Sequence, residues 1–182
     1  MPRIPLLPPS ALDAEQRTLY DAITGGPRGS GPQHFALTHP DGSLTGPFNA
    51  LLQSPSVGAA LQEVGAALRY RTSLSDRARE IAILLVAARW DSAFERSAHE
   101  PVGRAAGLTD DEILALGDQR VDGLPDDERV VGRTVTALLD GDLTDEEWDA
   151  AAAALGTPVV FELTTLVGYY STLALQLRVF RV

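Results

Sequence analysis

Apolar side chains recur along most of the chain at spacings of three and four residues, which is the pattern of amphipathic helices. Capping boxes and Ser-Pro or Gly-Pro starts mark where many of these helices begin. We expect helices after Asp13, at 46–52, after Ser54, after Ser75, at 91–106, after Thr109, at 126–139, after Thr144 and from Thr157. No segment alternates with a period of two, and the length of the last apolar run favours a helix over a strand. The pattern therefore predicts an all-α fold.

Two segments stand apart from the helical pattern. Four prolines among residues 1–10 predict an extended arm that lies over the domain or over a partner subunit. Residues 25–46 are rich in Gly, Pro, Ser and Thr, and read as one long loop of the kind that is often functional or mobile. No composition shift divides the rest, so we expect a single domain over residues 1–182.

Two of the expected helices are more apolar than the others. The helix after Ser75 is apolar nearly all round through residues 81–86, which predicts a central position. The helix from Thr157 has Glu162 as its only acid. A buried carboxylate without a partner is costly, so Glu162 implies an arginine partner or a site, and a structural ion pair is the favoured interpretation.

The composition excludes several classes of partner and of chemistry. Fifteen basic residues, all of them Arg, oppose 25 acidic ones and give a formal charge of −10, which disfavours nucleic acid as a partner. The absence of Lys excludes Schiff-base chemistry, and the absence of Cys excludes disulfides, thiol nucleophiles and Cys-ligated metals. No apolar run is long enough for a membrane span, and the Pro-broken start has no signal-peptide core. We therefore expect a cytoplasmic protein without a membrane partner.

The sharpest chemical pattern lies in the helix at 91–106. Ser92, Glu95 and His99 are spaced i, i+3 and i+7, so they share one face. A carboxylate four residues before an imidazole accepts its ring proton and leaves the other nitrogen to move protons on a substrate. By spacing alone, a solvated surface pair is the competing interpretation. We expect no metal, because a third ligand would have to come from His34, His39 or elsewhere.

Arginines and tyrosines supply further candidates. Five arginines bracket the central helix, and a local group of them suits a small carboxylate through bidentate hydrogen bonds. These residues are Arg69, Arg71, Arg77, Arg79 and Arg89. Pairing with nearby acids is the competing interpretation for each of them. Tyr169 and Tyr170 line a pocket or belong to the core.

Several of these motifs together resemble the carboxymuconolactone decarboxylase family. The resemblance covers most of the chain and rests on segments that are specific only in combination. They are Gly46-Pro47-Phe48, Leu52-Gln53-Ser54-Pro55, Leu74 to Leu84, Phe94-Glu95-Arg96-Ser97-Ala98-His99, Ala106 to Thr109, Phe161-Glu162-Leu163 and Gly168-Tyr169-Tyr170. The family is similar in fold to alkyl hydroperoxidase D, which implies a helical bundle that forms dimers, trimers or hexamers.

The same resemblance assigns the chain to a branch without cysteines. Counting back from His99, the two cysteine positions of the peroxidase branch fall on Ser92 and Glu95, so the thiol peroxidase cycle is excluded. The chain instead resembles the decarboxylase branch, in which an aromatic-Glu-Trp motif precedes the His, although here Arg96 stands in place of the Trp. This replacement places an anion contact beside the site.

The resemblance implies a cofactor-free decarboxylase that acts on a small carboxylated lactone or a related cyclic acid. His99 is then the proton donor and Glu95 orients it. Arg96 or Arg79 holds the substrate carboxylate, and Ser92 and Tyr169 complete the expected substrate contacts. No cofactor is needed, since decarboxylation requires delocalisation of the developing carbanion and a timely proton.

Two other interpretations of the function stay open. The same His and Glu suit an isomerase or cyclase that tailors a larger natural product, or the chain is a non-catalytic oligomer that binds a small acid. A homo-oligomer is expected in every case, because the Pro-rich arm needs a surface to lie on and the last helix is largely apolar.

Overall fold

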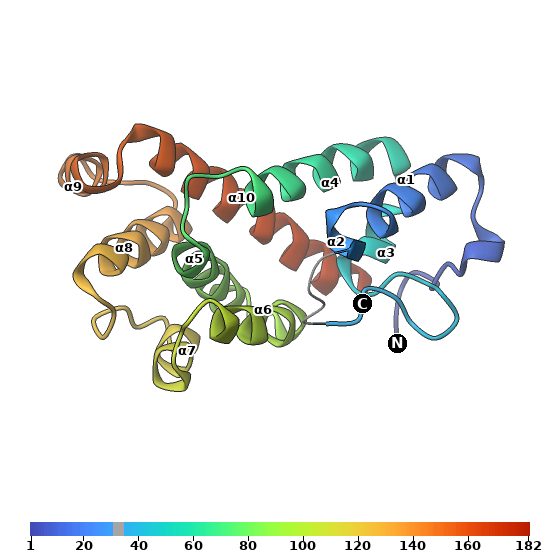
Figure 1. The fold of residues 1–182 in the computed structure, drawn as a ribbon, viewed down its shortest axis with the longest axis horizontal. Coiled ribbons are helices and arrows are strands. Elements are labelled where there is room, and N and C mark those ends of the chain that lie inside the picture. The colour runs from blue at the N-terminus through green and yellow to red at the C-terminus, as the bar shows by residue number, and fades with distance from the viewer. Residues whose placement is uncertain (31–34) are drawn as a thin grey trace. The chain divides into compact units, whose positions relative to one another are not determined.

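The computed structural model describes residues 1–30 and 35–182. These residues form helices joined by turns and loops, and Thr38 and Leu44 make an isolated antiparallel bridge. The elements are η1 (Pro9–Ala11), α1 (Ala14–Thr24), α2 (Pro27–Ser30), α3 (Pro47–Leu51), α4 (Pro55–Tyr70), α5 (Asp76–Arg89), α6 (Ala93–Ala105), α7 (Asp110–Gly117), α8 (Asp126–Asp140), α9 (Asp145–Leu155) and α10 (Thr157–Phe180) (Figure 1). The all-α prediction is confirmed for this part of the chain.

The predicted helix starts agree with the structure because local hydrogen bonds fix them. Asp13, Thr109 and Thr144 each form a complete capping box, and the Ser75 hydroxyl accepts from the Ala78 N–H. Gly107 follows α6 with a φ of 96°, a left-handed conformation that favours glycine. Pro101 lies inside α6, which runs from Ala93 to Ala105 as one helix.

The helices gather into two compact units. The first comprises Met1–Ala66 with Leu175–Val182, and the second comprises Ala67–Ala174, so α4 and α10 contribute residues to both. The single domain over residues 1–182 stays a prediction.

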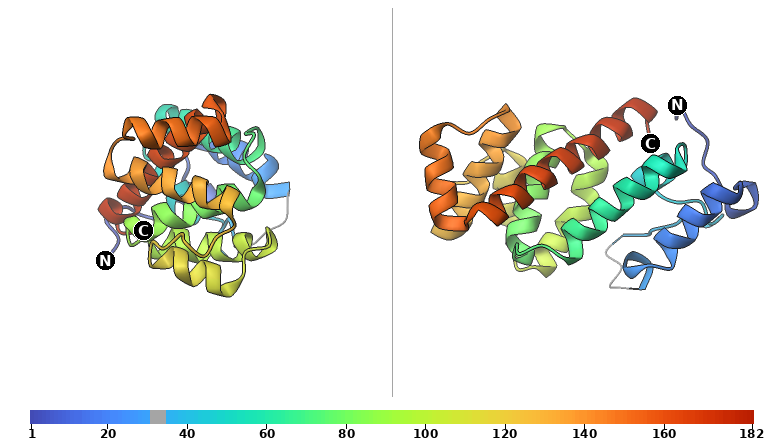
Figure 2. Two further views of the ribbon diagram at one scale, coloured as in Figure 1. Left: turned by 90° about the vertical axis from the view of Figure 1, so that its left-hand side faces the viewer. Right: turned by 90° about the horizontal axis from the view of Figure 1, so that it is seen from above.

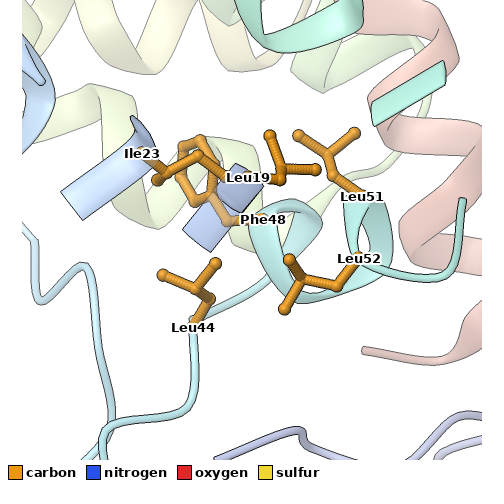
Figure 3. Packing of buried hydrophobic residues seen from close by; sticks show 6 residues of the cluster. All are labelled: Leu19, Ile23, Leu44, Phe48, Leu51 and Leu52. Carbon is orange, nitrogen blue, oxygen red and sulfur yellow. The ribbon is translucent and has the colours of Figure 1, made fainter. Parts of the chain in front are cut away.

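The first unit has its own hydrophobic core (Figure 3). Two residues of α1 pack there with residues of the α3 region and with one residue from the segment before it. The cluster consists of Leu19, Ile23, Leu44, Phe48, Leu51 and Leu52. The segment 25–46 is therefore not one plain loop, because it contains α2 and sends the fully buried Leu44 into this core.

The N-terminal arm lies over its own unit. The amide of the fully buried Asn49 binds it on both sides, since the Leu7 N–H donates to Asn49 Oδ1 and Asn49 Nδ2 donates to the Pro5 carbonyl, at 3.1 and 3.0 Å. The Arg3 N–H donates to the carbonyl of Phe180 at 2.8 Å. The arm that the sequence predicted is thus held by contacts within the same chain. The arm therefore gives no separate support to an oligomer.

The second unit is built around α5. Every residue from Arg79 to Ala87 is buried, which confirms the central position that the apolar pattern predicted. α5 packs against α6, α7 and α8, and α8 packs against α9 (Figures 1 and 2). Glu162 of α10 accepts the Ser73 N–H with both carboxylate oxygens, at 3.1 and 2.9 Å. The acid thus holds the turn before α5 through the main chain, and the predicted arginine partner is wrong.

The apolar character of the helices bears on membranes. Among the described residues, no single helix has both the length and the apolar composition to cross a membrane. The pair formed by α9 and α10, bent by 114° at their junction, meets that test when its members are taken together.

Candidate active site

His99 and Glu80 form the centre of the candidate site. His99 Nδ1 on α6 lies 2.7 Å from Glu80 Oε2 on α5, and the two side chains are 9% and 0% exposed. An ionised carboxylate accepts hydrogen bonds and donates none, so this contact selects the ring form with a proton on Nδ1. The other ring nitrogen, Nε2, is then the one that exchanges a proton with a substrate.

Glu95 lies on the opposite side of the ring. Its Oε2 is 3.6 Å from His99 Nε2, too far for a direct hydrogen bond, and its side chain is 4% exposed. The i, i+4 spacing brought Glu95 to the same helix face, as the sequence predicted. The prediction that Glu95 orients the ring is corrected, because the nitrogen at hydrogen-bond distance from a carboxylate faces α5 and its partner is Glu80. His99 therefore stands between two buried carboxylates, of which one holds it.

A tight connection between α5 and α6 produces this arrangement. It consists of Trp90, Asp91 and Ser92, and Asp91 has a φ of 49°, a left-handed conformation that Asp tolerates better than most residues. The Ser92 hydroxyl accepts from the Glu95 N–H at 3.4 Å and caps α6. The contact that the structure gives the Ser92 side chain is thus a helix cap, whereas the sequence placed this residue at the substrate.

Two tyrosines of α10 extend the cluster. The Tyr170 ring meets the His99 ring edge to face, with centroids 5.3 Å apart and planes at 86°. Tyr169 makes the same kind of contact with Tyr170, at 5.2 Å and 88°. Both tyrosines are buried. Tyr169, the residue chosen from the sequence, packs on Tyr170, and the Tyr170 ring contacts His99.

Arg79 of α5 interacts with the cluster through Glu80. Its Nη2 forms an ion pair with Asp76, and its Nε lies 3.8 Å from Glu80 Oε1. The guanidinium is buried, and its ion pairs are with two acids of its own helix. The sequence assigned Arg79 to a substrate carboxylate, but the structure directs its charge toward Glu80.

Arg96 takes part in a different set of contacts. Its Nε and Nη2 donate to Glu100 Oε1 at 3.3 and 3.2 Å, and its side chain is 43% exposed. The guanidinium also lies against Gly117 of α7, where an added Cβ would come within 3.4 Å of Nη2. These contacts do not join Arg96 to His99, although the two residues are close in sequence.

His34 and His39 are the two remaining histidines that the sequence offered as further metal ligands. His34 lies outside the described residues, and His39 belongs to a turn of the first unit, where its N–H donates to the Ser43 carbonyl at 2.8 Å. Among the described residues, no group of three or more His, Cys, Asp or Glu side chains is arranged to hold a metal ion.

Sequence reasoning missed Glu80 as a member of the site, and it named Tyr170 as a pocket or core residue but chose Tyr169 for the substrate contact. Glu80 had a usable signal, because an acid that opens the apolar run at 81–86 must be buried and paired. Its partner is 19 residues away on another helix, and helical periodicity carries no information about that contact. No signal distinguished Tyr170 from Tyr169.

A scan against models of protein families finds no match to the chain, and a search of curated proteins finds no significant match.

Proposed function

We propose that the chain is an enzyme that moves a proton by acid–base catalysis without a cofactor, with His99 as the residue that exchanges the proton. The observation that carries the proposal is the 2.7 Å contact between His99 Nδ1 and Glu80, which fixes the ring and directs Nε2 away from α5. Burial of both groups strengthens their interaction, because the surrounding dielectric is low.

The reaction that we propose first is decarboxylation of a small carboxylated lactone or a related cyclic acid. The resemblance of the motifs around Glu95 and His99 to the carboxymuconolactone decarboxylase family supports it, together with an alkyl hydroperoxidase D-like bundle and a homo-oligomer as parts of the same proposal. The bond to the carboxylate carbon breaks, carbon dioxide leaves, and its electron pair is delocalised as a dienolate. His99 Nε2 then gives a proton to the substrate carbon and regains one from solvent.

A second candidate is proton transfer without loss of carbon dioxide, as in an isomerase or cyclase. The positions of Arg79 and Arg96 favour it. Decarboxylation benefits from a cation that holds the substrate carboxylate, whereas both guanidinium groups form ion pairs with acids of the chain itself. An isomerase needs His99 and its carboxylates but no such cation.

Turnover of a substrate panel tests the proposal. The panel contains carboxymuconolactone, other carboxylated lactones and β-keto acids, and both carbon dioxide and the organic product are measured. We expect conversion by the wild-type protein and a loss of about 1000-fold or more in His99→Gln, because general acid–base catalysis contributes about 100- to 10,000-fold. His39→Gln serves as the matched control and retains activity.

The two products separate the two candidates. Carbon dioxide that depends on His99 identifies a decarboxylase, and an isomer formed without carbon dioxide identifies the second candidate. Undiminished conversion by folded His99→Gln would refute both.

A further inference from the structure

Arg79 is the buried cation nearest to the candidate site, and its position is unusual for a substrate clamp. The Glu80 carboxylate is shared, since Oε2 contacts His99 Nδ1 at 2.7 Å and Oε1 lies 3.8 Å from Arg79 Nε. The cation and the imidazole thus stand on the two sides of one fully buried acid.

A buried carboxylate needs a compensating charge. Without one, the cost of removing Glu80 from water favours its neutral form, and a protonated carboxyl no longer acts as a fixed acceptor for the Nδ1 proton. Neither Arg79 Nε nor Glu80 Oε1 has a hydrogen-bond partner among the described residues, so the pair interacts through charge across 3.8 Å. Asp76, with a side chain 78% exposed, holds the other end of the guanidinium in place.

We infer that Arg79 is a positioning residue, which stabilises the charge of Glu80 so that Glu80 holds one tautomer and one orientation of His99. The inference rests on the proposed function only for its consequence in catalysis. The effect on His99 itself exists with or without a substrate.

The charged and titratable groups around His99 determine the direction in which its titration is expected to shift. Among the described residues, His99 faces Glu80 from α5, Glu95 from α6 and Tyr170 from α10. Glu80 faces Arg79 in turn. Loss of Arg79 favours the neutral form of Glu80, and a neutral Glu80 no longer stabilises the charged imidazole, so the titration of His99 moves to lower pH when Arg79 becomes neutral.

Histidine NMR provides the test, and it requires no substrate. The protein carries ¹⁵N-labelled histidine, and the signal of His99 is separated from those of His34 and His39 by single His→Gln variants. We expect Arg79→Gln to lower the midpoint of the His99 titration by about 0.5 pH unit or more and to lower the population of the Nδ1–H tautomer. Arg79→Lys restores the charge and reverses most of the shift.

A matched control and a double variant make the test specific. Arg89→Gln removes an exposed arginine from the same helix and leaves the His99 titration unchanged. When Arg79→Gln is added to the Glu80→Gln variant, the titration of His99 changes little, because the carboxylate that couples the two residues is gone. An equal shift in both backgrounds would overturn the inference, as would an unchanged His99 signal in folded Arg79→Gln.

Failure to fold is also informative. If Arg79→Gln alone is unfolded, the double variant Arg79→Gln/Glu80→Gln removes the uncompensated acid and is expected to fold. Loss of folding in both variants would overturn the inference, because Arg79 would then support the fold independently of Glu80. A shift of His99 together with full turnover by His99→Gln would refute the proposed function and leave the positioning role intact.

Discussion

Two charged clusters of the second unit begin on the same helix, α5, only a few residues apart. In the first, Arg77 donates to Glu128 at 2.7 and 2.8 Å, to Glu112 at 2.9 Å and to the Gly107 carbonyl. In the second, His99 has one ring nitrogen 2.7 Å from Glu80 and the other 3.6 Å from Glu95. All three guanidinium nitrogens of Arg77 are hydrogen-bonded, whereas one nitrogen of His99 has no direct bond to a carboxylate.

This difference separates a structural cluster from a chemical one. Hydrogen bonds from Arg77 to Glu128 hold the pKa of the guanidinium above its usual value, so its proton does not move at any physiological pH. The group ties α5 to α7 and α8 permanently. His99 is held on one side only, and its Nε2 keeps the capacity to exchange a proton. The predictions below test whether the two clusters divide stability and reactivity in this way.

Loss of the Arg77 side chain has the largest expected effect on stability. Arg77→Ala leaves Glu112 and Glu128, with side chains 16% and 14% exposed, without their cation, and we expect a loss of about 3 kcal/mol in the free energy of unfolding. Urea denaturation measures it. Arg89→Ala removes an exposed ion pair with Asp140 and costs less than about 1 kcal/mol. Equal losses in the two variants would contradict the structural role of Arg77.

Neutral replacements of one acid in each cluster sharpen the comparison. Glu80→Gln lowers turnover by about 100-fold, because an amide supports the charged imidazole much less than a carboxylate does. Glu128→Gln keeps turnover within about twofold of wild type and lowers stability instead, since it removes a charge-assisted hydrogen bond to Arg77. Steady-state rates and urea midpoints on the same preparations decide between the outcomes. A similar loss of rate in both variants would contradict the division into a structural cluster around Arg77 and a reactive cluster around His99.

The contact between Tyr170 and His99 has a smaller expected effect. Tyr170→Leu removes the edge-to-face contact and lowers turnover by about fivefold, as an aromatic pair is worth about 1 kcal/mol. Tyr170→Phe keeps the ring and separates the packing from the hydroxyl group. Tyr169→Leu is the comparison variant, because the Tyr169 ring packs edge to face on the Tyr170 ring. A larger loss in the Tyr169 variant would show that the sequence had selected the correct tyrosine.

The smallest effect concerns acid stability and belongs to Glu112. Burial opposes its ionisation, but hydrogen bonds from the Thr109 N–H and from Arg77 outweigh burial and hold the pKa of the carboxyl below its usual 4.5. A lowered pKa in the folded state stabilises the fold above the unfolded value, and this contribution disappears as the pH falls through the folded value. Glu112→Gln should therefore be less stable than wild type at pH 7, and the gap should narrow below about pH 4.5. Chemical denaturation across that range measures the difference in the free energy of unfolding between Glu112→Gln and wild type. A difference that stays constant with pH would contradict the lowered pKa of Glu112.

Much of the fold was readable from the sequence because helix starts are encoded locally. Asp13, Thr109 and Thr144 carry their capping partners three residues ahead, and the structure forms all three boxes. The long segment 25–46 was harder, since α2 has only four residues and shows no periodicity. No signal in the sequence distinguishes its buried residue Leu44 from an exposed apolar loop residue.

The site was readable only in part because its contacts join different helices. The face that carries Glu95 and His99 follows from spacing within one helix, and the structure brings those two residues together. Glu80 and Tyr170 reach His99 from α5 and α10, and no local pattern reports such contacts. Arg96 shows the converse, because proximity in sequence placed it beside His99 and its helix turns it toward Glu100 and α7.

Deuterium transfer from solvent tests the central claim, that His99 exchanges a proton with a substrate carbon, most directly. The substrate panel is incubated in D₂O with wild-type protein and with His99→Gln, and the products are followed by NMR and mass spectrometry. Decarboxylation and isomerisation both predict a solvent deuteron at the reacting carbon in the wild-type product and its loss in the folded variant. Equal incorporation by the two proteins, or conversion by wild type without any deuterium, would contradict the account.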